Sequence, residues 1–172
     1  CDNLLSITFE RGSALTSIQA HGLEGMKKLQ SIDFGNARLT NIDNFAFRFC
    51  ESLERVEIPD GVTYLGRYAF YYCVKLKELI IPESVEFIGR YVCLGAAKTN
   101  IYFKSDKLPA QLQEDWDYGL GGYYVGVVNV LTEGDWKYAH LSSGDIGIIE
   151  YLGNSAAVDM TKLSFGGDIV SI

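Results

Sequence analysis

The sequence repeats itself with a fixed period of 23 residues. Residues 50–59, Cys-Glu-Ser-Leu-Glu-Arg-Val-Glu-Ile-Pro, return as residues 73–82, Cys-Val-Lys-Leu-Lys-Glu-Leu-Ile-Ile-Pro, with a shift of 23 at every matched position. A fixed period of this size is typical of stacked-repeat proteins, in which each repeat forms one coil that buries its apolar edge against its neighbours. We therefore predict a solenoid in which the repeated residues are used for stacking. Its function is expected to depend on residues that differ between coils.

The repeat extends toward the N-terminus, and its extra residues fall in a single turn. That turn takes three residues at 59–61, four at 35–38 and five at 10–14, after which the register recovers. Stacked coils tolerate insertions confined to one loop, since every other position has a neighbour above and below. The predicted coils are residues 1–25, 26–49, 50–72 and 73–95. A further strand is expected at 101–103, where the pattern ends.

Each coil is expected to have three parts. The pattern Leu-x-x-Ile-x-Ile predicts a short strand with alternate residues facing inward, and Pro59 and Pro82 end it. A second extended piece, Val-x-x-Ile-Gly, places Gly66 and Gly89 at a corner that is predicted to need a positive φ. The pattern Tyr-Ala-Phe-x-x-Cys then predicts one turn of α-helix or 3-10 helix. The predicted fold class is mostly β, with coils of about 23 residues and short helical or 3-10 turns.

The chain changes character after residue 103. Residues 104–135 are rich in glycine and aromatic residues, which argues against disorder and predicts an irregular cap or connection. Residues 136–172 predict a β-hairpin, with strands at 136–141 and 146–151 joined by Ser-Ser-Gly-Asp. The spacing at 158–160 and 169–172 then repeats that of the earlier coils, which predicts the first coil of a second repeat segment. We therefore expect three units, 1–103, 104–135 and 136–172, in a fragment of a longer protein.

The four cysteines, Cys1, Cys50, Cys73 and Cys93, form no CxxC pair, so neither a zinc ribbon nor a thioredoxin-type site is predicted. The first three share one repeat position with Met26, which indicates a buried position for a soft, medium-sized side chain. Buried free thiols are therefore favoured. A Cys50–Cys73 disulfide is the alternative, because adjacent coils lie ~4.8 Å apart. A lipid anchor on Cys1 is a further, minor alternative.

Composition and motifs exclude several classes of function. The formal net charge is −7, and an acidic chain repels phosphate backbones, so no nucleic-acid partner is predicted. The longest apolar run, near 123–131, is far shorter than the ~20 residues that span a bilayer, so no direct membrane insertion is expected. His21 and His140 have no ligands at metal-binding spacing. With no nucleophile, phosphate-binding or calcium-loop motif, we predict no catalytic residue, no metal and no cofactor, and the chain is expected not to be an enzyme.

Residues from Leu53 to Cys73 match nearly every position of Leu-x-x-Ile-x-Ile-Pro-x-x-Val-x-x-Ile-Gly-x-x-Ala-Phe-x-x-Cys. This pattern resembles the BspA-like bacterial leucine-rich-repeat surface proteins, and the resemblance covers residues 1–103. It implies a right-handed leucine-rich-repeat solenoid, secreted or on the cell surface. It also implies a non-enzymatic role in adhesion, with a protein on a host or neighbouring cell as partner. The coil at 73–95 departs from the pattern near its end.

Two columns of variable residues on the predicted strands are the first candidate site. They lie between the inward-facing apolar positions and stack from coil to coil, which predicts one continuous surface for a protein partner. The candidate protein-binding residues are Ser31, Asp33, Arg55, Glu57, Glu78 and Ile80. The competing interpretation is a solvated polar face whose charges block edge pairing. The mixed signs of charge argue against a repetitive polyanionic or polycationic ligand.

An aromatic cluster is the second candidate site, and it belongs to a different class of function. Its residues lie in the segment that is predicted to cap the solenoid, and they are Trp116, Tyr118, Tyr123 and Tyr124. Because Trp and Tyr can stack on sugar rings, the cluster predicts a carbohydrate-binding module as the alternative function, with a glycan as partner. The competing interpretation is that these side chains pack the corners and the cap.

Overall fold

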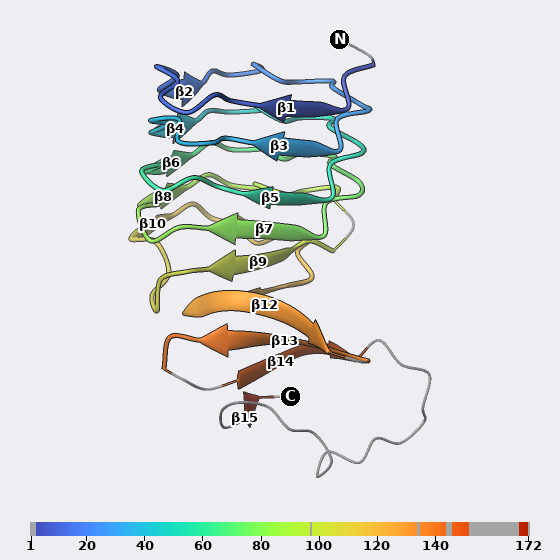
Figure 1. Cartoon of the computed structure of the whole chain (residues 1–172), viewed down its shortest axis with the longest axis vertical. Helices are drawn as coiled ribbons and strands as arrows, with labels where there is room; N and C mark the ends of the chain where they lie inside the picture. The colour runs from blue at the N-terminus through green and yellow to red at the C-terminus, as the bar shows by residue number, and fades with distance from the viewer. Residues whose placement is uncertain (1–2, 97, 134, 144–145, 152–168, 172) are drawn as a thin grey trace.

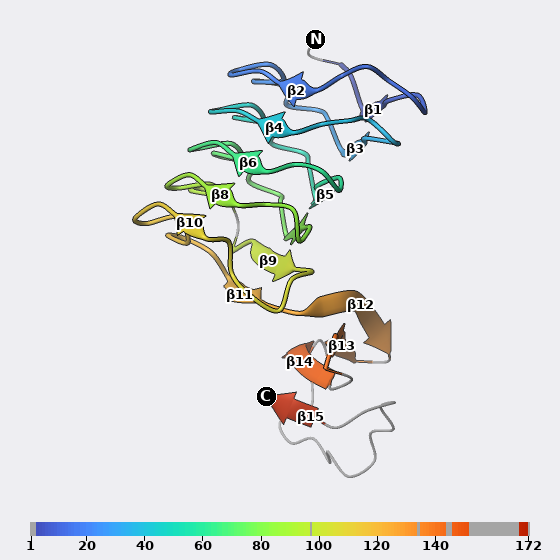
Figure 2. The ribbon, with the colours of Figure 1, turned by 90° about the vertical axis from the view of Figure 1, so that its left-hand side faces the viewer.

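The computed structural model describes residues 3–96, 98–133, 135–143, 146–151 and 169–171. The chain winds as a parallel solenoid, with short strands stacked from the N-terminal end downward (Figure 1). Seen from the side, the coils lie one below another as flattened turns (Figure 2). The prediction of a mostly β solenoid with coils of about 23 residues is therefore confirmed.

The first strand of each coil lies on one side of the solenoid, which we call the strand face. Its strands are β1 (Ser6–Thr8), β3 (Ser31–Asp33), β5 (Arg55–Glu57), β7 (Glu78–Ile81), β9 (Asn100–Phe103) and β11 (Gly122–Tyr124). β1 pairs in parallel with β3, while β5, β7, β9 and β11 form a separate parallel sheet. No hydrogen-bonded pairing joins β3 to β5, although both strands lie wholly within the described residues. Alternate residues point inward, so Val56 is buried between exposed Arg55 and exposed Glu57.

The second strand of each coil belongs to a continuous five-stranded parallel sheet. Its strands are β2 (Ser17–Ile18), β4 (Asn41–Ile42), β6 (Tyr64–Leu65), β8 (Phe87–Ile88) and β10 (Gln111–Leu112). β10 pairs with β8, and β11 pairs with β9. The parallel stacking therefore continues past residue 103, and the segment expected to be irregular adds one strand to each of the two parallel sheets. Backbone pairing needs extended chain and an inward apolar residue such as Leu112, and it does not need the full repeat pattern. The division into three domains stays a prediction.

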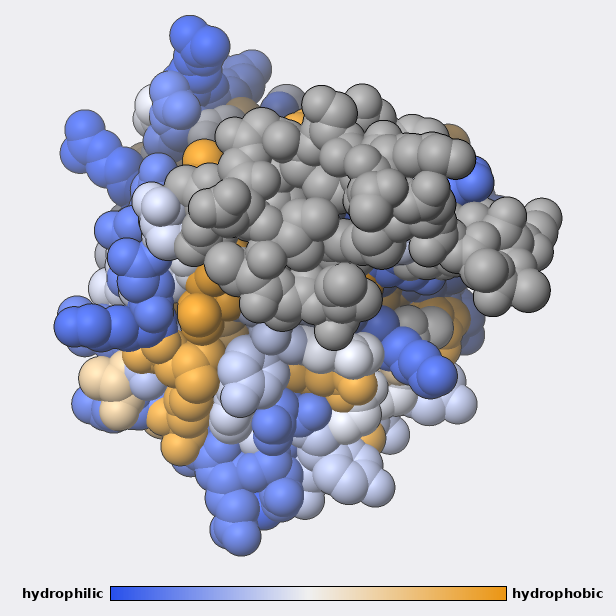
Figure 3. Space-filling model, turned by 90° about the horizontal axis from the view of Figure 1, so that it is seen from below, coloured by the Kyte–Doolittle hydropathy of each residue, from blue (hydrophilic) through white to orange (hydrophobic). Residues whose placement is uncertain are grey.

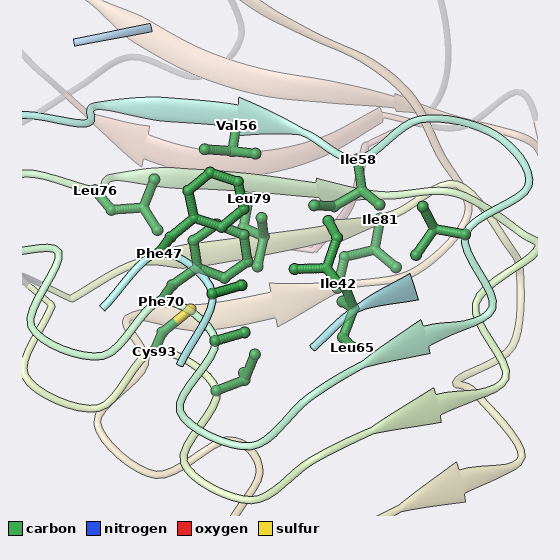
Figure 4. Close-up of a cluster of buried hydrophobic side chains, with 14 of the residues drawn as sticks. Ile42, Phe47, Val56, Ile58, Leu65, Phe70, Leu76, Leu79, Ile81 and Cys93 are labelled. Carbon is green, nitrogen blue, oxygen red and sulfur yellow. The ribbon is translucent and has the colours of Figure 1, made fainter. Parts of the chain in front are cut away.

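The repeated apolar positions fill one core that runs through the coils (Figure 4). Equivalent side chains of successive coils lie against each other, and the rings of Phe47 and Phe70 stack with centroids 5.0 Å apart. The following are fully buried: Ile42, Leu53, Ile58, Leu65, Leu76 and Leu79. Burying one such side chain stabilises a fold by about 1.5–3 kcal/mol. Each coil is consequently held mainly by the coils above and below it.

Cys50, Cys73 and Cys93 are buried free thiols, which confirms that prediction for these three residues. Cys1 lies outside the described residues. The Sγ atoms of Cys50 and Cys73 donate weak hydrogen bonds to backbone carbonyls at 3.3 and 3.1 Å. Burial raises the pKa of Cys50 and of Cys93 to about 12. These thiols are therefore protonated at neutral pH, and a protonated thiol is a poor nucleophile.

The corner after the second strand is a run of tight turns, each closed by a hydrogen bond between residues three apart as in a 3-10 turn, and no α-helix forms at residues 66–73. The Ala69 N–H bonds to the Gly66 carbonyl at 3.3 Å, which closes one turn. Tyr68 and Tyr72 then have positive φ values of 56° and 58°. A left-handed residue at every fourth position cannot continue a right-handed helix. The N–H groups of Tyr68, Phe70 and Tyr72 bond instead to carbonyls of the next coil, at 3.2, 2.8 and 2.9 Å. Bonding between coils thus replaces bonding within a helix.

Gly66 and Gly89 allow two coils to approach closely, and neither has the positive φ that the sequence predicted. A Cβ atom on Gly89 would lie 2.3 Å from the backbone nitrogen of Arg67. A Cβ atom on Gly66 would lie 2.4 Å from the backbone nitrogen of Asn44. Among the glycines of the third coil, positive φ falls instead on Gly61, at 101°, in the turn after β5. Steric contact with the neighbouring coil, and not backbone strain, excludes a side chain at these corners.

A small antiparallel sheet follows the solenoid (Figure 1). Its strands are β12 (Val127–Glu133), β13 (Trp136–Leu141), β14 (Ile146–Tyr151) and β15 (Ile169–Ser171), in that order. β13 and β14 form the hairpin that the sequence predicts, although part of its turn lies outside the described residues. β12 pairs with β13 and was not expected, because the pattern placed it in the irregular segment. β15 pairs in parallel with β14, while residues 158–160 of the expected second repeat segment lie outside the described residues.

Candidate binding face

The registers of the strands place the variable residues of the strand face in two columns. Arg55 lies opposite Glu78, and Glu57 lies opposite Ile80. In the first two coils, Thr8 lies opposite Asp33 and Ser6 lies opposite Ser31. All of these side chains except Glu78 and Ile80 are exposed. The exposed part of the candidate face therefore belongs to the first three coils.

Charged side chains on the strand face form a chain of ion pairs. Lys104 Nζ lies 3.0 Å from Glu57 Oε1, and the Arg55 guanidinium lies 3.4 Å from Glu57 and 3.3 Å from Glu78. Lys137 Nζ of β13 lies 2.6 Å from Glu78 Oε1. Burial lowers the pKa of Lys137, but its hydrogen bond to Glu78 acts in the opposite direction and the net pKa is raised. Exposed pairs each contribute about 0–1 kcal/mol, so the main effect is to fix the positions of Arg55 and Glu57.

Ile80 is covered by the antiparallel sheet. It forms a buried cluster with Tyr102, which lies opposite it on β9, and with Val127 and Ala139 of the antiparallel sheet. Val127 is 4% exposed whereas the next residue, Val128, is 63% exposed, so one side of β12 faces the solenoid. Viewed from below, this end of the molecule shows apolar residues among hydrophilic ones (Figure 3). Of the six candidate residues, Ile80 is thus used for packing.

A groove of about 960 Å³ opens on the strand face between the second and third coils. One wall is residues 30–40, which include β3, and the other is residues 54–61, which include β5. The groove coincides with the missing pairing between β3 and β5. Ser31, Asp33, Arg55 and Glu57 all line it, and Lys104 lies beside them. Four of the six candidate residues therefore surround one concave site.

The four residues of the aromatic cluster do not share one surface. Trp116 is buried, with its ring 5.9 Å from Phe103 and 5.3 Å from Tyr123. Tyr124 is half-buried and stacks on Tyr102 at 5.5 Å. By contrast, Tyr118 is 61% exposed and Tyr123 is 45% exposed. Two residues of the cluster therefore pack the end of the solenoid, and two present rings to solvent.

A smaller cavity of about 360 Å³ lies beside Tyr124, where the last coils meet the antiparallel sheet. Polar and basic residues line most of it: Lys77, Lys98, Asn100, Lys137 and Glu150. A cavity of this size is at the lower end of the range for small-ligand sites. It supplies hydrogen-bond donors and one half-buried aromatic ring, which are the groups that a sugar requires.

A ladder of aromatic rings along the tight turns is a feature that the sequence showed only in part. The rings of His21 and Phe45 stack at 5.0 Å and those of Phe45 and Tyr68 at 5.1 Å, while the ring of Tyr91 lies 5.4 Å from that of Tyr68 and is tilted by 34°. All four residues have positive φ, from 56° to 62°. The sequence signal for this ladder was the recurrence of an aromatic ring at the repeat spacing in Phe45, Tyr68 and Tyr91. Because the faces of His21, Phe45 and Tyr68 lie against one another, these three rings have few free faces for a ligand.

Within the part of the chain that the structure describes, no three His, Cys, Asp or Glu side chains cluster as metal ligands. His21 pairs with Glu24 on the surface, and His140 lies beside the ring of Tyr138. The two histidines therefore belong to separate local contacts. Over the same described residues, no helix has the length and apolar character that crossing a membrane requires.

Comparison with known proteins identifies the class of repeat. A family model described as BspA type leucine rich repeat region matches residues 1–108 in six copies. Among solved structures, the chain is similar to a leucine rich cell surface protein from Faecalibacterium prausnitzii A2-165, with 24% sequence identity and a TM-score of 0.58. The match covers 88% of this chain and 41% of that one, so the chain spans less than half of that structure. No curated protein matches the chain. At this identity the structural match shows a shared fold.

Proposed function

Because the chain belongs to the BspA-type leucine-rich repeat family, we propose that it is a non-enzymatic adhesion module that binds a protein partner through its strand face. The observation that carries this proposal is the groove of about 960 Å³ on that face. Its walls hold the exposed side chains of Ser31, Asp33, Arg55 and Glu57. Solenoids use extended surfaces of this kind to bind other proteins.

The fold match supports a cell-surface or secreted location for this module, since the matched protein is described as a cell surface protein. The proposed partner is a protein on a host or neighbouring cell. Arg55 and Glu57 are held in place by ion pairs, so a partner would meet a fixed pattern of charge. Fixed charges contribute more to the rate of association and to specificity than to affinity.

The test is binding to a panel of immobilised host-matrix and cell-surface proteins. The double variant Asp33→Lys, Arg55→Glu reverses two charges in the groove and keeps the net charge of the chain. We expect it to weaken binding at least tenfold, which corresponds to about 1.4 kcal/mol. The matched control is Lys27→Glu, Glu86→Lys, which reverses two exposed charges away from the groove. Equal binding by both double variants would contradict the strand-face proposal.

The alternative function is a carbohydrate-binding module at the C-terminal end of the solenoid. It is favoured by the exposed rings of Tyr118 and Tyr123 and by the cavity of about 360 Å³ beside Tyr124. A glycan array tests it with the variant Tyr118→Ala, Tyr123→Ala, which leaves the buried Trp116 in place. Glycan binding that this variant loses, and that the groove variant Asp33→Lys, Arg55→Glu keeps, would support the alternative.

A further inference from the structure

The first column of variable residues on the strand face ends beside a cavity. After Arg55 and Glu78, Asn100 of β9 continues the column. Gly122 of β11 then ends it without a side chain. The cavity of about 360 Å³ lies at this end, where the last coils meet β13 and β14 (Figure 1). Small ligands often bind where two structural units meet, so this is a suitable place for a ligand site.

Three lysines from separate segments line this cavity. Lys77 directly precedes β7, Lys98 lies two residues before Asn100, and Lys137 belongs to β13. The Lys77 carbonyl accepts a hydrogen bond from the Asn100 N–H at 2.8 Å, so Lys77 and Lys98 both adjoin Asn100. Acids outnumber bases in the chain by 22 to 15. A cavity with three lysines is therefore a local reversal of the overall charge.

Two of these lysines have no opposite charge as a partner. Lys77 and Lys98 are exposed, and neither has an ion pair within the described residues. Lys137 is mostly buried, and its Nζ lies 2.6 Å from Glu78 Oε1, so its charge is already compensated. Among the described residues that line the cavity, Glu150 is the one acid. Two uncompensated lysines and one acid leave one positive charge in excess, which suits a ligand with one negative charge.

The other groups that line the cavity suit a hydroxylated ring. Tyr124 presents a half-buried aromatic ring, which stacking on Tyr102 at 5.5 Å holds in place. Asn100 carries an amide that can both donate and accept hydrogen bonds, and Ile149 adds an apolar contact. A simple anion would use neither the ring nor the amide, and a neutral sugar would leave the two lysines uncompensated. A sugar with a carboxylate uses all of these groups.

We propose that the cavity binds a sugar that carries one carboxylate, such as a uronic acid or a sialic acid at the end of a glycan. Its carboxylate pairs with Lys77 and Lys98, its hydroxyl groups hydrogen bond to the Asn100 amide, and its ring packs on Tyr124. Lys137 stays paired with Glu78. This inference rests on the alternative carbohydrate-binding function and names the class of its ligand.

Isothermal titration calorimetry of the whole chain with four small molecules tests the inference. They are glucuronic acid, N-acetylneuraminic acid, the methyl ester of glucuronic acid, and sodium acetate. We expect at least one of the two acidic sugars to bind at least about tenfold more tightly than the ester and the acetate. Equal binding by the ester would show that the charge is not recognised, and equal binding by acetate would show a general anion site. Either result, or no binding by both acidic sugars, would overturn the inference.

The double variant Lys77→Gln, Lys98→Gln removes the two uncompensated charges. Because both side chains are exposed, the fold should be unaffected, and we expect affinity for the acidic sugar to fall at least about tenfold. The matched control is Lys28→Gln, Lys107→Gln, which removes two exposed lysines away from the cavity and should keep affinity unchanged. Equal affinity in the two double variants would contradict the inference.

Glu150→Gln provides a test in the opposite direction. It removes the acid beside the proposed carboxylate and keeps the size of the side chain, so we expect the acidic sugar to bind about threefold more tightly. A gain of affinity cannot result from a loss of folding. Unchanged or weaker binding of the acidic sugar by this variant would contradict a carboxylate in the cavity.

The outcomes separate this inference from the carbohydrate-binding function on which it rests. Glycan binding that Tyr118→Ala, Tyr123→Ala loses, and that Lys77→Gln, Lys98→Gln keeps in full, would support the function and exclude the cavity as an acidic-sugar site. Acidic sugars that bind in the cavity of a protein that recognises no glycan of the array would support the site and leave the function without support.

Discussion

Glycine at the second corner of each coil is required by a neighbour in space and not by its own backbone. A Cβ atom on Gly89 would lie 2.3 Å from the nitrogen and 2.6 Å from the Cα of Arg67. Backbone atoms cannot move aside as the end of a flexible side chain can. The repeat spacing of Gly66 and Gly89 predicted the need for glycine correctly, but the reason lies in a contact between residues 22 positions apart.

We expect Gly89→Ala to destabilise the protein by about 3 kcal/mol, the upper end of the usual cost of overpacking. The free energy of unfolding in urea measures this effect. The matched control is Gly122→Ala, where the nearest atom to a new Cβ is 3.5 Å away and φ is not positive. That variant is expected to change stability by no more than about 0.5 kcal/mol. Similar losses for the two variants would show that close approach between coils is not the reason for Gly89.

Because its thiols are buried, the free energy of unfolding of the protein depends on pH in alkaline solution. The pKa of Cys93 is raised to about 12 by burial, whereas an unfolded cysteine titrates near ~8.5. Above that lower value the unfolded chain loses a proton that the folded chain keeps, so stability falls as pH rises. The stability that the protonated Cys93 thiol contributes is complete below pH ~8.5. It is lost progressively as the pH rises toward the folded pKa of about 12.

We expect the free energy of unfolding to decrease between pH 9 and 11, and to decrease less steeply in Cys93→Val. One such thiol contributes a slope of about 1.4 kcal/mol per pH unit in this range. Denaturant titrations at several pH values measure the slope, and the comparison of slopes removes any constant loss from the substitution itself. Identical slopes in both proteins would mean that Cys93 ionises in the folded state.

The antiparallel sheet is positioned by apolar residues that point outward from the strands of the solenoid. Ile80 and Tyr102 occupy strand positions that face away from the core, and both are buried under β12 and β13. The equivalent position holds a polar residue in each of the first three coils, namely Thr8, Asp33 and Glu57. The change from polar to apolar residues along this column of strand positions marks where the antiparallel sheet begins to cover the strand face.

We expect Ile80→Asp to detach this cover, because a buried carboxylate without a partner costs several kcal/mol. Amide exchange in β12 and β13 should become faster, while exchange in β4 and β6 stays unchanged. The control is Thr8→Asp, which puts the same group at the same position of an uncovered coil and should leave β12 and β13 unaffected. Unchanged exchange in Ile80→Asp would show that the sheet is held in place by other contacts, such as Lys137 with Glu78.

Elements whose residues recur at the repeat spacing could be predicted, and elements that depend on a single coil could not. The strands at 55–57 and 78–81 follow from their matched apolar residues, and the hairpin follows from its turn sequence. The tight turns were expected only as one turn of α-helix or 3-10 helix, because a pattern such as Tyr-Ala-Phe-x-x-Cys does not show which backbone groups bond to the next coil. β10 and β12 lie beyond the repeated pattern, so no comparison between coils revealed them.

The same limit applies to the candidate site. The columns of Arg55 with Glu78 and Glu57 with Ile80 could be predicted, since register follows from the period. The groove could not, because it arises where the ladder between β3 and β5 is absent. Nor could the sequence show that Trp116 would be buried while Tyr118 stays exposed.

The molecule as a whole is a stack in which each coil contacts mainly its neighbours. Stability in such proteins is close to a sum of coil and interface contributions. We therefore expect removal of one complete coil, residues 50–72, to leave a folded and shorter solenoid. Circular dichroism should keep its β signal, and the urea m-value should fall with the surface that is buried. Removal of only residues 50–61 breaks the register and should abolish cooperative unfolding. Loss of folding in both deletions would contradict additive stacking.

The interrupted ladder also bears on how the molecule responds to force. Most neighbouring coils are joined by pairing on the strand face, by pairing in the second sheet and by backbone hydrogen bonds between their tight turns. The second and third coils have the last two of these but lack pairing on the strand face, among the described residues. Tension along the stack would therefore act first at this junction, and the first two coils would separate from the others as one unit. Single-molecule pulling would record this as an early step of two coils. A stack of coils built in this way would lengthen under load while its remaining coils stay folded.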